Sequence, residues 1–417
     1  MSSRTVSSLQ PVRGTHDLLP DEARRHRHIE NVALKTAALY GFGEIETPIF
    51  EFTEVFSRTL GETSDVVTKE MYTFADRSGE SITLRPEGTA GVARAFISGG
   101  LAQNLPLKFI YRGPMFRHER PQKGRLRQFH QVGVELLGVP GPAADIEVIA
   151  LGHHILSELG LGAQVTLEIN SLGDAESRTR YRETLVAYLS AHASKLSAES
   201  RDRLGRNPLR VLDSKDEGDR AIVDGAPALA DSLNEASKDF FKAVTDGLAA
   251  VGVSFRLNPF LVRGLDYYGH TAFEFTTTML GAQGTVLAGG RYDGLIGQMG
   301  GPATPGIGWA AGVERLAMLC AQDLSAPRPV AIVPLGDSET ALVLAQRLRR
   351  AGFAVDLGYS GSLKKRMARA VKLSARVAVI LGEEEAARGN VVLRDLDSAT
   401  QEEVSLDRLE ERLAGFY

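Results

Sequence analysis

A cluster of cationic side chains between two apolar segments is the most informative feature of this sequence. Residues 112–127 contain six lysines and arginines and a single acid, Glu119. Guanidinium and ammonium groups bind phosphate oxygens, and a guanidinium does so through two parallel hydrogen bonds. The cluster predicts a site for a polyphosphate, a nucleic acid or both, unless it is only a solvated charged hairpin. Its cations are Arg112, Arg117, Arg120, Lys123, Arg125 and Arg127.

The apolar segments on either side, 107–116 and 128–137, have the composition of two strands joined by the basic loop. Side chains two residues apart share one face of a strand. Phe129, Gln131 and Glu135 should therefore face the same way. An aromatic ring on this face could stack on a nucleobase, Arg117 could hold a phosphate, and Glu135 could bind an ammonium group.

Two further segments place polar side chains at the ends of expected elements. In 84–90, Glu87 and Thr89 lie where a strand meets a helix, so they either bind a ligand or cap the helix. In 261–270, Arg263 has apolar neighbours, so its partner is either a ligand or Asp266.

Two glycine-rich segments follow. Residues 287–294 combine glycines with Tyr292, but the segment lacks the Gly-Lys-Ser/Thr of a phosphate-binding P-loop. Residues 306–316 run from a strand into a helix whose first turns carry Arg315. A cation is disfavoured there unless it meets an anion, so a bound phosphate or an exposed arginine is expected. No spacing of histidines or of Cys320 suggests a metal site.

Both helices and strands are expected to position these residues. Short hairpins and helices up to residue 173 favour an α+β fold with an antiparallel sheet. A strand is expected at 44–50, after a helix at 21–40. Residues 174–252 have helical periodicity and are expected to be an insertion, after which the first domain resumes at 253–324. Residues 325–329 are a proline-rich linker, and 330–417 alternate strand and helix, which predicts a small α/β domain.

The bulk composition limits the function. The formal net charge is −4, so any anion binding must be local. A single cysteine and the lack of any run of about 18 apolar residues fit a cytoplasmic protein without a membrane span.

Taken in order, these segments resemble the histidyl-tRNA synthetase family of class II aminoacyl-tRNA synthetases. The likeness begins at residues 11–17 and extends into the C-terminal domain. Residues 41–56 resemble class II motif 1, 116–131 motif 2 and 306–316 motif 3, while 261–268 and 289–295 resemble two segments peculiar to the histidine enzymes.

The resemblance implies a role for each matching residue. Arg117 would hold the α-phosphate of ATP, Arg125 and Arg315 the other phosphates, Phe129 and Glu119 the adenine, and Arg263 both the substrate carboxylate and the α-phosphate. The residues expected around histidine are Glu87, Thr89, Gln131, Glu135, Tyr268 and Tyr292. Glu135 and Tyr268 are the candidates for its ring nitrogens.

The resemblance also implies partners. Mg²⁺ would accompany ATP, a homodimer would form through the motif 1 region, and Arg120 and Gln122 would meet the acceptor end of tRNA(His). Residues 347–376 carry nine cations and one acid, which suits RNA binding by an anticodon-binding domain. Two alternatives remain: a histidine-sensing paralogue of the type of the ATP phosphoribosyltransferase regulatory subunit, and a plain RNA-binding or scaffold protein.

Overall fold

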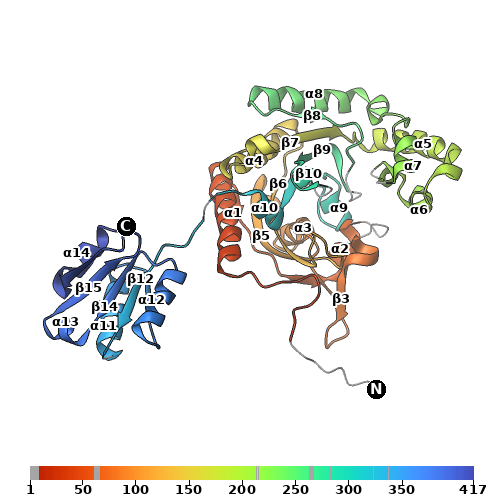
Figure 1. The fold of residues 1–417 in the computed structure, drawn as a ribbon. Coiled ribbons are helices and arrows are strands. Elements are labelled where there is room, and N and C mark those ends of the chain that lie inside the picture. Colours follow the sequence, from red (N-terminus) through yellow and green to blue (C-terminus); the bar gives the residue numbers. More distant parts are fainter. Residues whose placement is uncertain are drawn as a thin grey trace, which may run out of the picture. The chain divides into compact units, whose positions relative to one another are not determined.

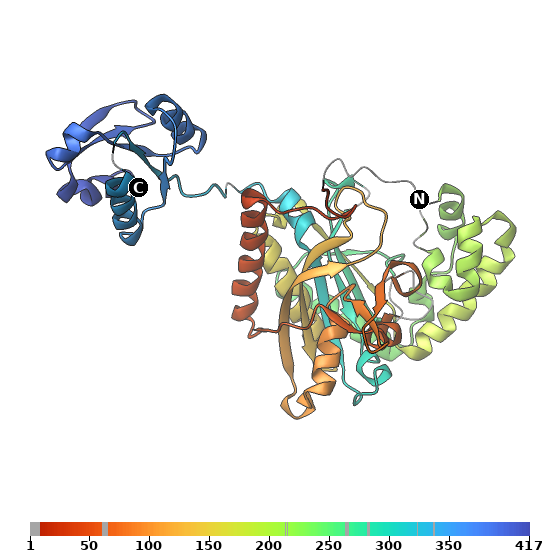
Figure 2. The same ribbon diagram turned by 90° about the horizontal axis from the view of Figure 1, so that it is seen from below.

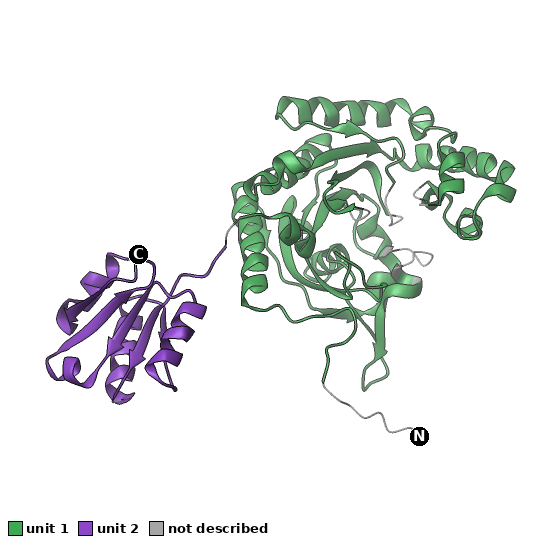
Figure 3. Ribbon diagram, in the orientation of Figure 1, with its two compact units in different colours: residues 1–323 green, residues 324–417 purple. Residues whose placement is uncertain are grey.

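The computed structural model describes residues 9–60, 66–212, 214, 216–262, 267–281, 284–322, 324–336 and 338–417. The chain forms two compact units, residues 1–323 and 324–417 (Figure 3). Among the described residues, no helix combines the length and the apolar composition needed to cross a bilayer.

An eight-stranded, mainly antiparallel sheet organises the first unit (Figure 1). Only the short end strands pair in parallel, β1 with β5 and β7 with β8. The predicted α+β fold with an antiparallel sheet is therefore confirmed. In spatial order the strands are β1 (Gly43–Glu44), β5 (Leu107–Phe116), β6 (Gln128–Leu137), β11 (Gly306–Gly312), β10 (Thr285–Arg291), β9 (Gly269–Thr276), β7 (Thr166–Ser171) and β8 (Arg256–Leu257).

Helices bury one face of this sheet. Helix α1 starts at Pro20, whose fixed φ suits a first helical turn, and its buried residues Ile29, Ala33 and Ala37 recur every four residues. They share a core with Val132 and Val134 of β6. The helices that contribute to this core are α1 (Pro20–Leu39), α4 (Pro142–Glu158), α8 (Glu235–Ala250) and α10 (Val313–Leu319).

The opposite side of the unit carries a small sheet and the remaining helices. Strand β4 (Ser81–Leu84) pairs with β2 (Phe50–Phe52) and β3 (Tyr72–Ala75). Helices α1 and α5 to α7 lie at opposite ends of the unit (Figure 2). The helices are α2 (Thr53–Leu60), α3 (Thr89–Ser98), α5 (Ala175–Ala191), α6 (Ala198–Arg206), α7 (Glu217–Val223) and α9 (Leu295–Gln298).

The continuous strand predicted at 44–50 is wrong. The segment divides between two sheets, because β1 pairs with β5 whereas β2 pairs with β4. The Ile45 N–H still donates to Ile110 O at 2.9 Å, but Pro48 has no N–H with which to continue a ladder.

The second unit contains a five-stranded sheet with β12 (Val330–Pro334) between β13 (Val355–Leu357) and β14 (Val377–Leu381), all parallel. Apolar side chains of α11, such as Leu344 and Leu348, pack on these strands. Two antiparallel strands that the alternating pattern did not predict extend the sheet, β15 (Asn390–Asp395) and β16 (Gln401–Ser405). The helices are α11 (Ser338–Arg350), α12 (Leu363–Lys372), α13 (Glu383–Ala387) and α14 (Leu409–Ala414).

Candidate active site

A cavity of about 1220 Å³ brings together side chains from segments far apart in the sequence. It extends onto the helical segment 174–252, which contributes Arg203, Arg210 and Arg220. The predicted site residues that line it are Glu87, Thr89, Arg117, Glu119, Arg125, Phe129, Gln131, Tyr268 and Arg315.

The strand pair β5–β6 sets the floor of this cavity. Its register places Phe129 opposite Met115 and Gln131 opposite Gly113. Phe129 and Gln131 thus face the cavity as strand alternation requires. The Oε1 atom of Gln131 is buried and accepts no hydrogen bond from the described part of the chain. A buried oxygen without a hydrogen bond lowers the stability of the folded protein unless a ligand or water donates to it.

One end of the cavity is cationic. The Arg117 guanidinium lies 5.3 Å from the centroid of the Phe129 ring, and its Nε donates to Pro86 O at 2.8 Å. Arg125 Nη1 is 3.1 Å from Glu119 Oε2, and Arg117 Nη1 is 3.7 Å from Glu119 Oε1. The single acid of the basic loop therefore lies between two of its arginines.

Arg315 joins this cationic end from α10. Its Nη1 donates to Thr285 O at 2.7 Å and its Nε to Gly124 O at 3.2 Å. Burial lowers the pKa of Arg315, and the charges of Arg125 and Arg117 lower it further. Three guanidinium groups thus repel one another around one carboxylate, and a polyanion would relieve that repulsion.

The other end contains buried carboxylates. Glu87 accepts hydrogen bonds from the backbone N–H groups of Thr89 at 2.6 Å and Ala90 at 2.8 Å, at the start of α3. Burial raises its pKa. The Thr89 hydroxyl in turn donates to Glu135 Oε1 at 2.6 Å, and the Tyr292 hydroxyl donates to Glu135 Oε2. Burial raises the pKa of Glu135 to about 8.

Glycines allow this end to pack so closely. A Cβ atom on Gly308 would overlap Glu135 Oε2, and one on Gly306 would overlap the Tyr292 ring. Glu135 and Tyr292 lie beneath the cavity wall rather than on it, because neither residue lines the cavity whereas Thr89 does.

Three of the predicted residues remain, Arg263, Arg120 and Gln122. Arg263 and its alternative partner Asp266 fall outside the described residues. Arg120 and Gln122 are exposed in the basic loop, where Gln122 and Arg125 exchange two backbone hydrogen bonds of 3.1 and 2.8 Å.

The sequence reasoning missed two residues that shape the site. The Tyr111 ring fills the space above Gly88 and Gly133, where a Cβ would overlap it. Its place opposite Gly133 in the strand pair was the available signal. Arg178 of the helical segment donates to the backbone oxygen of Tyr268, and no feature of its sequence neighbourhood predicted that contact.

Comparisons with known proteins agree with this geometry. A family model described as histidyl-tRNA synthetase matches residues 14–316, and a model of the anticodon-binding domain matches residues 329–415. Histidine--tRNA ligase of Rhodospirillum rubrum is 69% identical over 414 residues, which cover 99% of this chain and 100% of the relative. Histidine--tRNA ligase of Gluconobacter oxydans is 59% identical over 96% of this chain and 97% of that protein.

Solved structures show the same fold. The apo histidyl-tRNA synthetase of S. aureus is similar over 97% of this chain and 99% of that one, with a TM-score of 0.80 and 35% identity. A Bacillus halodurans protein, described as an ATP phosphoribosyltransferase regulatory subunit/histidyl-tRNA synthetase, shares the fold with a TM-score of 0.61 and 24% identity, over 86% of this chain and 97% of that one. With both family models and full-length relatives in agreement, this chain belongs to the histidyl-tRNA synthetase family.

Proposed function

We propose that this protein activates L-histidine with ATP to form histidyl-adenylate and transfers the histidyl group to the 3′ end of tRNA(His). Full-length relatives named histidine--tRNA ligase support this function. The structural observation that carries it is the cavity, which has three arginines at one end and buried carboxylates and hydroxyls at the other. Such a cavity suits one polyphosphate and one amino acid.

Activation joins two anions, because the histidine carboxylate attacks the α-phosphorus of ATP in line with the departing pyrophosphate. Arginines can neutralise both without blocking the line of attack. We assign the α-phosphate to Arg117 and the β- and γ-phosphates to Arg125 and Arg315. Phe129 would stack under the adenine. Mg²⁺ would enter with ATP as part of the substrate and neutralise the pyrophosphate as it departs.

Glu119 would accept a hydrogen bond from the adenine amino group. It lies between Arg117 and Arg125, so ATP must share it with those cations. Arg263, proposed to bridge the histidine carboxylate and the α-phosphate, stays a prediction from sequence alone.

The histidine end needs hydrogen bonds to both ring nitrogens, because a site that pairs both rejects apolar isosteres strongly. We propose Tyr268 and Glu135 for this task, with Glu87, Thr89, Gln131 and Tyr292 around them. Since Glu135 already accepts from Thr89 and Tyr292, one of these bonds must rearrange for direct contact with the ring. Replacing Glu135 with Gln should weaken histidine binding far more than ATP binding.

The function is tested by histidine-dependent ATP–pyrophosphate exchange, followed by aminoacylation of a tRNA(His) transcript. Exchange and charging are both expected. A protein that binds histidine but catalyses no exchange would instead be a regulatory paralogue. That alternative has less support, since the phosphate-end arginines are all present and an anticodon-binding domain follows.

We further propose that the second unit binds the anticodon stem-loop and that Arg120 and Gln122 meet the acceptor end of tRNA(His). Three of the nine cations in 347–376 form ion pairs: Arg347 with Glu410, Arg369 with Asp356 and Arg376 with Asp395. Lys364, Lys365 and Lys372 are exposed along α12 and are our candidates for RNA phosphates.

A homodimer through the motif 1 region is the last part of the proposal. Phe50 and Phe52 of β2 are 58% and 57% exposed, and Phe74 of β3 is 48% exposed. Phe52 and Phe74 flank Ile82 in register, so they share a face of the small sheet. A group of exposed aromatic side chains indicates an interaction surface, and the family implies a second copy as its occupant.

Replacing Phe52 with Asp should therefore produce monomers, because a charge in an apolar interface is desolvated without a partner. Sedimentation equilibrium measures the mass. Leu257→Asp, at an equally exposed site in the same unit, is the matched control and should remain dimeric. A dimer that survives Phe52→Asp would place the interface elsewhere.

A further inference from the structure

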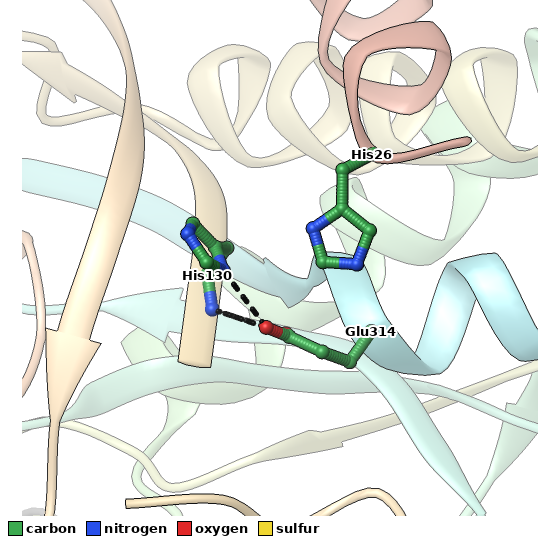
Figure 4. A group of neighbouring side chains, drawn as sticks. All are labelled: His26, His130 and Glu314. Atoms are coloured by element: carbon green, nitrogen blue, oxygen red, sulfur yellow. Dashed lines mark hydrogen bonds and ion pairs between the residues drawn. The ribbon is translucent and has the colours of Figure 1, made fainter. Parts of the chain in front are cut away.

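A hydrogen-bonded group at the edge of the cavity, where Glu314 lines it, connects the two elements that are proposed to hold ATP. The carboxylate of Glu314, in α10, accepts the His130 backbone N–H with 2.9 Å to Oε1 and 3.0 Å to Oε2. His130 Nδ1 lies 2.9 Å from Glu314 Oε1 (Figure 4). One carboxylate thus holds both the main chain and the side chain of a residue 184 positions away.

The strand ladder explains why an acid is needed here. Strands β6 and β11 pair from Gly306↔Leu137 to Gly312↔Gln131, and β11 then turns into α10. His130 is the first residue of β6 beyond this pairing. The Glu314 carboxylate supplies the acceptor that the ended strand no longer offers, and a half-buried N–H without one would be costly.

The neighbours of these two residues include Phe129 and Arg315, which are proposed to hold ATP. Phe129 and Gln131 flank His130 and line the cavity. Glu314 and Arg315, which are adjacent in α10, line it too. His130 itself points the other way, since alternate residues of a strand face opposite sides. A displacement of Glu314 relative to His130 would therefore change the distance between the Phe129 ring and the Arg315 guanidinium.

His26 of α1 is the third member of the group and contacts His130. Its ring packs edge-on against His130 with centroids 5.3 Å apart, and the residue is 8% exposed. Its Nδ1 has no hydrogen-bond partner within the described residues. One ligand atom from each of His26, His130 and Glu314 lies within 4.8 Å of the others, a set that could also bind a transition metal. However, the atoms of His130 and Glu314 already satisfy each other at hydrogen-bond distance.

We propose that Glu314 and His130 are positioning residues for adenylate formation, which fix the separation between Phe129 on β6 and Arg315 on α10. This inference rests on the proposed function. Glu314 lines the cavity beside Arg315, but the role proposed for it acts through the residues that it holds in place. It predicts a larger defect for ATP than for histidine, because Glu135 is held by its separate bonds to Thr89 and Tyr292, and of the proposed histidine residues only Gln131 adjoins His130.

The test compares Glu314→Gln with wild type in pyrophosphate exchange. Glutamine keeps one acceptor but loses the second acceptor and the charge. We expect the KM for ATP to rise roughly tenfold and kcat to fall by a similar factor, with the KM for histidine changed less than about twofold. Glu147→Gln is the matched control, since Glu147 is a half-buried acid paired with Lys108 away from this cavity, and it should behave as wild type.

A rescue at His130 separates positioning from simple packing. Asparagine carries an amide N–H at nearly the position of Nδ1, so His130→Asn should retain activity within about threefold, whereas His130→Leu should reproduce the Glu314→Gln defect. Equal loss in the Asn and Leu variants, or equal rises in the KM for ATP and histidine, would overturn the proposal. So would stoichiometric zinc in the purified protein that Glu314→Gln removes, which would make the group a metal site. Absence of exchange in wild type would refute the proposed function instead.

Discussion

The two ends of the cavity differ in how far the protein itself satisfies their charged side chains. At the end proposed to bind histidine, each Glu135 oxygen already accepts a hydrogen bond and the residue is 1% exposed. At the end proposed to bind the phosphates of ATP, Arg117 and Arg315 donate to backbone oxygens while their like charges remain close together. The carboxylate of the first end is fully hydrogen-bonded within the protein, which fixes its position in advance. The second is electrostatically incomplete and gains from an arriving anion.

The strongest test of this contrast removes a cation from the phosphate end. Arg117→Gln should lower kcat for pyrophosphate exchange by about 10³-fold, because preorganised positive charge at the α-phosphate is lost. The KM for histidine should change little, since Glu135 and its partners are untouched. Steady-state exchange kinetics at varied histidine measure both.

Arg112→Gln is the matched control for this change. Arg112 lies on the same hairpin, but it pairs with Glu30 and Glu44 away from the cavity. It should retain near wild-type kinetics. Equal losses in both variants would mean that the hairpin needs its charges only for folding.

At the end proposed to bind histidine, a change in side-chain volume rather than in charge should reduce activity. A Cβ on Gly308 would overlap Glu135 Oε2 and the backbone oxygen of Val134, so Gly308→Ala must displace that carboxylate. Displacements of about 1 Å near a reacting centre can cost about 10²-fold in rate. We expect a loss of that size with a raised KM for histidine and a nearly unchanged KM for ATP.

Gly297→Ala controls for the glycine substitution itself. Gly297 lies in α9, and no atom outside its own helix turn is within 4 Å of a Cβ built there. This variant should be as active as wild type. An ATP-specific defect in Gly308→Ala would contradict the separation of the two ends.

The sequence could predict the parts of the site that follow from local rules. Strand alternation placed Phe129 and Gln131 on one face, and the cavity is lined by both. Pairing across the chain could not be predicted in this way. The hydrogen bonds from Tyr292 to Glu135 and from His130 to Glu314 join residues 157 and 184 positions apart. Nothing local to either partner encodes them.

The prediction of helices and strands from the sequence has the same limit. The strands predicted at 107–116 and 128–137 match β5 and β6, because their apolar runs are long and bounded by the basic loop. The segment 44–50 misled the prediction, since its apolar and β-branched residues fit a strand whichever sheet they join. Pro48 was the available signal that the ladder must break.

The smallest expected effect concerns stability and pH. The pKa of Glu135 is about 8 in the folded protein, against an ordinary value of 4.5. Below pH 4.5 the carboxyl group is protonated in both the folded and the unfolded state, so it adds no pH dependence to the free energy of unfolding. Between 4.5 and 8 the unfolded chain releases the proton while the folded one holds it, so the contribution of Glu135 to stability falls as pH rises. Above pH 8 the penalty is constant.

Glu135→Gln removes this titration. The free energy of unfolding of the variant, relative to wild type, should therefore rise between pH 5 and 8, by at most about 1.4 kcal/mol per pH unit. Urea unfolding followed by circular dichroism at pH 5, 6.5 and 8 measures the difference. Burial also raises the pKa of Glu87, but this residue is present in both proteins, so its effect cancels in the difference. A constant difference would mean that Glu135 is ionised throughout. The histidine end would then hold a permanent anion, and its contrast with the phosphate end would be one of charge alone.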